Sequence, residues 1–138
     1  MLNRHPLVRM WDLLRKDTEL VDMLNKIRKE TSKQPLIYTF EIPENYQKTE
    51  QAPFIRLTEI MNGNALEHDG RSNHYRYLFA VETFGISIND VHSINERVVE
   101  IIESSDGICF ERELSRDDEF NLYNQMLSFN IILNKKEQ

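Results

Sequence analysis

One stretch constrains the fold more than any other, because the spacing of its apolar residues changes at Gly85 from every second position to the spacing of a helix. It reads HYRYLFAVETFGISINDVHSINERVVEIIE and runs from His74 to Glu103. Large side chains at every second position from Tyr75 to Thr83 predict a strand. The apolar stripe from Val91 to Ile102 has helical spacing instead. A strand that leads directly into an amphipathic helix predicts a layered domain in which the helix covers the sheet.

The rest of the chain predicts two more helices and four more strands. Apolar residues recur at helical spacing from Pro6 and again after Asp17, with a break near Asp17. Runs rich in β-branched and aromatic residues predict the strands, at Leu36–Ile42, Phe54–Ile60, Ile108–Leu114 and Leu122–Leu133. We expect a single domain, residues 1–138, of the α+β class. Its mainly antiparallel or mixed sheet has about five strands, with two to three helices packed on one face.

Turn chemistry predicts how these elements end. Asn89 or Asp90 is expected to cap the helix that follows Gly85. Ser104 to Gly107 should close that helix, with Gly107 in the left-handed conformation.

Three polar segments join the predicted elements: Pro43–Pro53, Asn62–His74 and Ser115–Asn121. The second contains Asn-Gly and Asp-Gly pairs and almost no apolar residues, so it predicts a long, mobile loop between strands. Loops of that length in compact domains usually carry function. The candidate interface residues therefore lie in these segments: Glu44, Tyr46, Lys48, Asn64, Glu67, Asp69, Arg71, Asp117 and Asp118.

Charge and composition argue against several classes of partner. The formal net charge is −6, and the Lys and Arg residues are scattered along the chain. Recognition of nucleic acid requires a concentrated basic surface, so specific binding of DNA or RNA is not expected. Charged residues interrupt the apolar N-terminal segment, which predicts no membrane association. The single cysteine, Cys109, allows no intramolecular disulfide.

The sequence offers no set of residues suited to catalysis, and we expect no enzyme, no cofactor and no metal. Glu67, His68, Asp69 and His74 could be drawn as a metal cluster, but their spacing matches no common zinc pattern. A solvated loop is the preferred interpretation. The charged turn from Arg116 to Glu119 lacks the glycine of a calcium loop. Cys109 has no neighbouring His or Lys to activate it, which favours a structural thiol.

The strand from Tyr75 to Phe84 has apolar residues on both faces, since Leu78, Ala80 and Phe84 alternate with its aromatic row. One face would pack on the helices. Large exposed apolar surfaces usually mark interfaces, so another subunit is expected to cover the other face.

Several features together resemble a known family. They are the unit YRYLFAVETFGISINDVHSINERVVEII, the preceding PFIRLTEI, and the charged turn followed by LYNQMLSFNIIL. In this order they are similar to the tail-terminator, or tail-completion, proteins of siphoviruses with non-contractile tails, found in phages and prophages of low-GC Gram-positive bacteria. The resemblance covers most of the chain and carries no invariant chemical signature.

The resemblance implies a structural role in virion assembly. Such proteins form a homo-hexameric ring on the tail tube, stop its polymerisation and present a surface to the head-tail connector. The partners would be other copies of this chain, the tail tube protein and the connector protein. DNA would pass through the ring without specific binding, and Glu67 and Asp69 would face the lumen. The protein would be assembled in the bacterial host cytoplasm and located in the virion tail.

Three alternatives stay open. A head-completion or neck protein of the same virion would share a small α+β fold. A host regulatory or binding module would use the long loops as a ligand site. An enzyme would require distant residues to meet in the fold as a catalytic pair.

Overall fold

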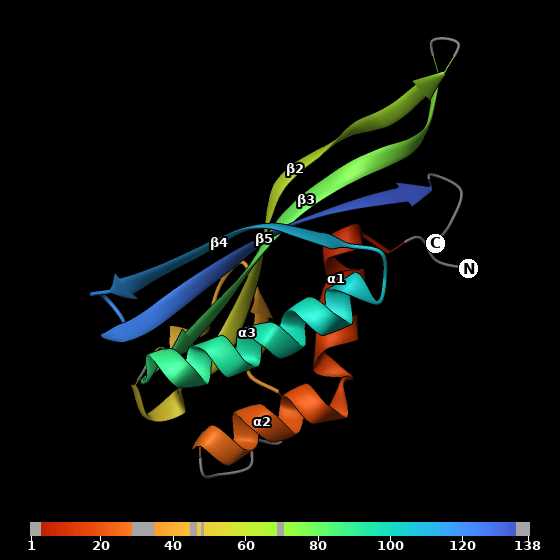
Figure 1. The fold of residues 1–138 in the computed structure, drawn as a ribbon. Coiled ribbons are helices and arrows are strands. Elements are labelled where there is room, and N and C mark those ends of the chain that lie inside the picture. The colour runs from red at the N-terminus through yellow and green to blue at the C-terminus, as the bar shows by residue number, and fades with distance from the viewer. Residues whose placement is uncertain (1–3, 29–34, 45–46, 48, 69–70, 135–138) are drawn as a thin grey trace.

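Five strands form one mixed sheet in the computed structural model, which describes residues 4–28, 35–44, 47, 49–68 and 71–134 (Figure 1). The elements are α1 (Pro6–Arg15), α2 (Thr18–Arg28), β1 (Ile37–Thr39), η2 (a 3-10 turn, Thr49–Gln51), β2 (Phe54–His68), β3 (Arg71–Gly85), α3 (Ile88–Glu103), β4 (Ile108–Asp117) and β5 (Leu122–Asn134). The strand order is β1-β2-β3-β5-β4, with only the β1–β2 pair parallel. The predicted α+β class is confirmed.

The helices begin where side chains accept hydrogen bonds from their first turns. Pro6 opens α1, and His5 Nδ1 accepts from the Leu7 amide at 3.1 Å. Asp17 Oδ2 accepts from the Leu20 amide at 2.9 Å, which confirms the predicted break between the first two helices. The cap predicted for α3 is wrong by two to three residues. Ser87 occupies that position, because its backbone is extended and its hydroxyl accepts from the Asp90 amide.

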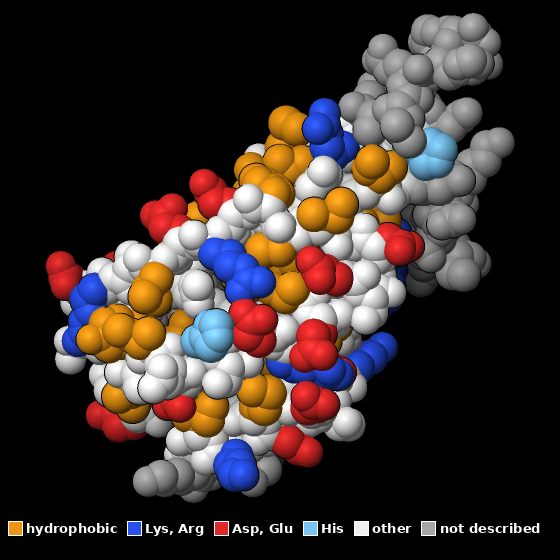
Figure 2. Space-filling view, viewed as in Figure 1, with side chains coloured by type: hydrophobic (Ala, Val, Ile, Leu, Met, Phe, Trp, Pro, Cys, Tyr) orange, Lys and Arg blue, Asp and Glu red, His pale blue; other side chains and the backbone are white. Residues whose placement is uncertain are grey.

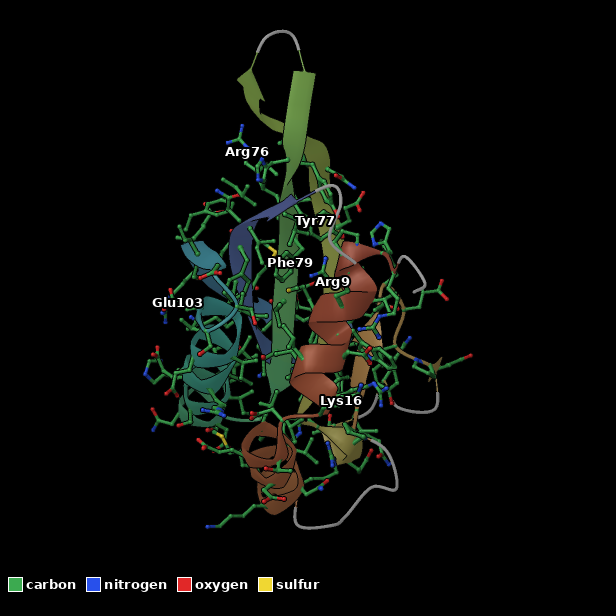
Figure 3. The ribbon with its side chains drawn as sticks, turned by 90° about the vertical axis from the view of Figure 1, so that its right-hand side faces the viewer. Arg9, Lys16, Arg76, Tyr77, Phe79 and Glu103 are labelled. Atoms are coloured by element: carbon green, nitrogen blue, oxygen red, sulfur yellow. The ribbon has the colours of Figure 1, made fainter. Side chains whose placement is uncertain are left out.

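The main core lies between the sheet and all three helices. Tyr77, Phe79 and Phe129 stack across β3 and β5, with ring centroids 5.7 and 5.3 Å apart, and all three are fully buried. Figure 3 shows Tyr77 and Phe79 between α1 and α3. The apolar stripes of the helices close over them, with these residues buried: Leu7, Met10, Leu14, Leu20, Leu24, Ile94, Val98 and Ile102. This face of the sheet is called the helix face below.

A second apolar cluster covers one end of the opposite face. Phe84 stacks on Phe54 at 5.2 Å and meets the edge of Phe120 at 5.0 Å. The segment before β2 completes this cluster with Leu36, Ile42 and Ala52. Our expectation that another subunit covers Phe84 is therefore wrong, because the chain buries this residue itself. Ala80 is buried as well.

The predicted loop from Asn62 to His74 is also wrong. Residues up to His68 continue β2 and residues from Arg71 continue β3, with Asn64 opposite Tyr75 and Glu67 opposite Ser72. The polar composition misled the prediction, because a two-stranded ribbon outside the core satisfies its backbone without burying side chains. The Asn-Gly signal lies within β2, and the Asp-Gly signal lies outside the described residues.

Smaller corrections concern backbone conformation. β1 is shorter than predicted because Phe40 has a φ of 62° and ends the strand. The left-handed residue after α3 is Asp106, with a φ of 71°, and not Gly107. Gly107 is required for space, since a Cβ there would lie 2.5 Å from Ile102 Cγ2.

The aromatic stack makes a stability prediction. Phe79→Ala should lower the free energy of unfolding by about 3–5 kcal/mol, because it removes the middle ring of a closed core. Phe110→Ala is the matched control, since Phe110 is 52% exposed. This variant should change the free energy of unfolding by less than about 0.5 kcal/mol. Urea denaturation followed by circular dichroism measures both. Equal losses in the two variants would contradict this assignment of the core.

Candidate assembly surfaces

Two hairpins leave the helix-covered body in different directions. In Figure 1 the β2–β3 hairpin rises above the helices, and the β4–β5 hairpin extends to the left. β5 pairs with β3 only as far as His74, opposite Asn134. Beyond that point the described backbone of the first hairpin pairs only within itself. Figure 3 shows Arg76 where β3 has already passed the ends of the helices.

The structure separates the predicted interface residues into two groups. Asn64, Glu67 and Arg71 lie on the β2–β3 hairpin, although their side chains, and Asp69 at its tip, lie outside the described residues. Glu44 is exposed at the other end of the sheet. β2 has 15 residues, which places the two ends roughly 45 Å apart.

The fold brings Glu44 close to the turn between β4 and β5. Glu44, Glu119 and Phe120 line a shallow pocket of about 370 Å³. Asp117 ends β4, and its Oδ1 accepts from the Phe120 amide at 2.9 Å, so this carboxylate stabilises the turn. Asp118 is exposed in the same turn. Tyr46 and Lys48 lie outside the described residues.

A cavity lies between α1 and α3. It has a volume of about 610 Å³ and an apolar floor that includes Met10, Ile131 and Leu133. Arg9 and Lys16 line it from α1, and neither forms an ion pair with the part of the chain that the structure describes. Figure 3 shows both residues along α1 and Glu103 on α3, which packs beside α1 on the helix face. Further polar side chains surround this apolar floor, among them Asp12, Arg97 and Ser104.

A partly buried ion pair beside this cavity joins α3 to the start of α2. Arg97 donates from Nε to Asp17 Oδ2 at 3.0 Å and from Nη2 to Asp17 Oδ1 at 2.7 Å. This hydrogen bonding from Arg97 holds the pKa of Asp17 below its usual range, against the opposing effect of burial. Asp17 also caps α2, so one carboxylate links a helix start to the neighbouring helix.

Exposed apolar side chains follow the unpaired edges of the sheet. β4 is an edge strand, and Ile108, Phe110 and Leu114 on it are 61%, 52% and 46% exposed. Ile60 and Met61 on β2 are 49% and 44% exposed. Sequence reasoning missed these residues, because the strand order decides which strands are edges. The spacing of apolar residues along the sequence carries no information about the order of the strands in the sheet.

The described surface offers little support for chemistry. No group of three His, Cys, Asp or Glu among the described residues could hold a metal ion. Burial raises the pKa of Cys109, as expected for a structural thiol. Figure 2 shows acidic and basic side chains intermixed over the helix-covered side, without a continuous basic surface. No helix within the described ranges is long and apolar enough to cross a membrane.

Comparison with known proteins gives a match in fold. No protein-family model matches the sequence, and no curated protein sequence matches it. Among solved structures, the chain is similar to a chain from the "Virion of native gene transfer agent (GTA) particle". The two superpose with a TM-score of 0.58 over 95% of this chain and 99% of that chain, at 10% identity. At this identity the likeness shows a shared fold.

The ion pair at the cavity predicts a pH-dependent stability. Arg97→Met should reduce the free energy of unfolding at pH 7, where Asp17 is ionised and keeps a charge without its partner. Because the pKa of Asp17 is lowered in the folded protein, the stabilisation is present above the unfolded value near 4 and is lost as pH falls through the folded pKa. The difference between variant and wild type should therefore shrink at about pH 3.

Urea denaturation at both pH values measures this effect. Arg112→Met is the matched control, because its partner Glu96 lies on the same helix but is far more exposed, with 48% of its side chain accessible against 18% for Asp17. That variant should lose less stability at pH 7. A loss in Arg97→Met that is equal at the two pH values would contradict the role of the Asp17 carboxylate.

Proposed function

We propose that this protein is a structural component of a phage-like virion. The observation that carries the proposal is the similarity in fold to a virion chain, which covers 95% of this chain and 99% of that chain. An assembly subunit also agrees with the surface, where exposed apolar residues follow strand edges and do not line a deep pocket. No catalytic step is part of this proposal.

Within the virion, the proposed role is that of a tail terminator. The order of elements and the quoted segments resemble that family, whose members form a homo-hexameric ring and end the tail tube. The ring would meet the tail tube protein on one side and the head-tail connector on the other. The β2–β3 hairpin extends farthest from the helix-covered body in Figure 1, so it is proposed to reach a neighbouring ring or the lumen.

The acidic residues near the hairpin tip have a proposed place in this ring. Glu67 and Asp69 would face the lumen, where negative charge keeps DNA from adhering as it passes. The net charge of −6 supports this part of the proposal. A structure of the assembled ring that places both residues on its outer wall would refute it.

The role in tail completion is tested by disrupting the gene in the phage or prophage that carries it. If the protein ends tube growth, electron microscopy of the lysate should show tails far longer than normal and filled heads without tails. Expression of the intact protein from a plasmid should restore normal particles. Tails of normal length with unjoined heads would indicate the neck protein instead. Intact virions would remove the protein from assembly.

The hairpin gives a sharper test of the same role. The described residues between 66 and 73 pair only within the hairpin, so the segment 66–73 can be replaced by Asn-Gly between Ala65 and His74 while all described pairing with β5 is kept. We expect the shortened protein to fold with nearly the same midpoint of thermal unfolding. It should fail to restore particles to the disrupted phage. Full restoration would show that the hairpin end is dispensable for assembly.

A further inference from the structure

We propose that copies of this chain associate head to tail by continuing one sheet from subunit to subunit. The free edge of β4 in one copy pairs antiparallel with the free edge of β2 in the next. This inference rests on the proposed role as a ring-forming virion protein, for which it supplies the contact between subunits. Its occupant is a second copy of the same chain.

The first of the two edges is β4. This strand pairs with β5 on one side and with no described strand on the other. Eight of its ten residues are exposed. A long exposed edge with apolar side chains readily takes on another strand, and proteins that stay monomeric usually protect such an edge. The bulge between Cys109 and Glu111 leaves regular pairing from Glu111 to Asp117 for a partner strand.

The second edge is the outer half of β2. β1 pairs with this strand only from Ile55 to Leu57, and the Phe40 amide donates to the Leu57 carbonyl at 2.8 Å. From Thr58 to His68, β3 lies on one side of β2, and no described strand lies on the other. This free segment is as long as β4. The exposed residues Ile60 and Met61 lie at its start.

The strand directions make the two edges compatible. β2 is antiparallel to β3, β3 to β5, and β5 to β4, so β4 and β2 of one sheet run in opposite directions. When two sheets are placed side by side in the same orientation, β4 of the first and β2 of the second are antiparallel. Antiparallel ladders are also slightly the more stable kind.

Pairing of β4 with itself across a two-fold axis is disfavoured by charge. The two-fold axis must stand perpendicular to the sheet. Because facing residues of antiparallel strands point to the same side of the sheet, the axis passes beside one residue of β4, the centre of the register, which then lies opposite its own copy. Centres at Glu111, Arg112 or Glu113 place that charged side chain opposite its own copy. A centre at 114 places Arg112 opposite Arg116, and a centre at 115 places Glu113 opposite Asp117. Like charges directly opposite are destabilising, so the regular part of β4 is better suited to a different strand.

The edge of β2 provides charge of the opposite sign. Glu59 is the only charged side chain among the described side chains of its free segment, residues 58–63, and it faces Phe79 on the helix face. Arg112 and Arg116 of β4 also lie on the helix face, because they pair with Leu127 and Tyr123. An antiparallel register that places Glu59 of one copy opposite Arg112 or Arg116 of the next therefore joins opposite charges on the same side of the sheet.

The two edges are different surfaces, so their contact is heterologous. Such a contact leaves one free edge at each end of any open chain of subunits, and it closes only as a ring. Ring closure pairs the free edge of every β4 with the free segment of a neighbouring β2, so that neither of these two edges stays exposed as it is in the monomer.

Cysteine cross-linking in purified full-length protein tests this pairing. In a Cys109→Ser background, one protein carries Glu59→Cys and a second carries Arg112→Cys or Arg116→Cys. Facing residues of adjacent antiparallel strands lie close enough for a disulfide. We expect a covalent dimer when the Glu59→Cys protein is mixed with one of the two arginine variants under mild oxidation. One chain carrying both cysteines should give a ladder of covalent oligomers.

The controls separate this contact from other associations. Glu100→Cys, an exposed site on α3, should give no dimer with Glu59→Cys. Dimers formed by an Arg112→Cys or Arg116→Cys protein alone would overturn the inference in favour of symmetric pairing. The absence of a dimer from both mixtures would overturn it as well. If the cross-links form but tails of the disrupted phage have normal length, the contact between subunits is retained and the terminator role is refuted. If the tails are overgrown but no cross-link forms, the terminator role is retained and this contact is refuted.

Discussion

The pairing of β3 with both of its neighbours is the constraint on which the rest of the structure depends. β3 contacts β2 over its whole length and β5 over twelve residue pairs, and it provides the middle of the aromatic stack. α3 follows after a short turn. Gly85 makes this possible, because a Cβ there would lie 2.8 Å from Val91 Cγ2. The glycine allows the first turn of α3 to close onto the end of the strand.

Burial on the helix face leaves the edges of the sheet as the available surface. The three helices cover one side, and the segment from Leu36 to Pro53 covers one end of the other. Exposed apolar side chains are found on β4 and on the start of the free part of β2, as well as at Val8, Phe40, Ile86, Ile88 and Ile132. Exposed strand edges with apolar side chains are the kind of surface on which proteins associate, and the proposed assembly role rests on them.

The β2–β3 hairpin illustrates how backbone pairing can override composition. Its outer half is polar and contains Gly63, yet it continues the register that the buried half establishes at Phe54 and Phe84. Once the core fixes that register, the backbone hydrogen bonds of the ladder can continue along the hairpin whatever the composition of its side chains. The result is an extension that carries the candidate residues Asn64 and Glu67 away from Glu44, to the opposite end of the sheet.

The sequence by itself determined the number and type of the main elements. Period, β-branched content and caps identified three helices and five strands, because these signals are local. They also identified the helix start at Asp17. The tertiary structure decided the order of the strands, and with it which strands are edges and which residues face one another. Phe110 and Leu114 have ordinary strand positions in the sequence, and they lie on an edge because β5 inserts between β3 and β4. Ile60 is exposed on the part of β2 that β1 does not reach. That order arises from long-range pairing in a twisted sheet, which no local pattern encodes.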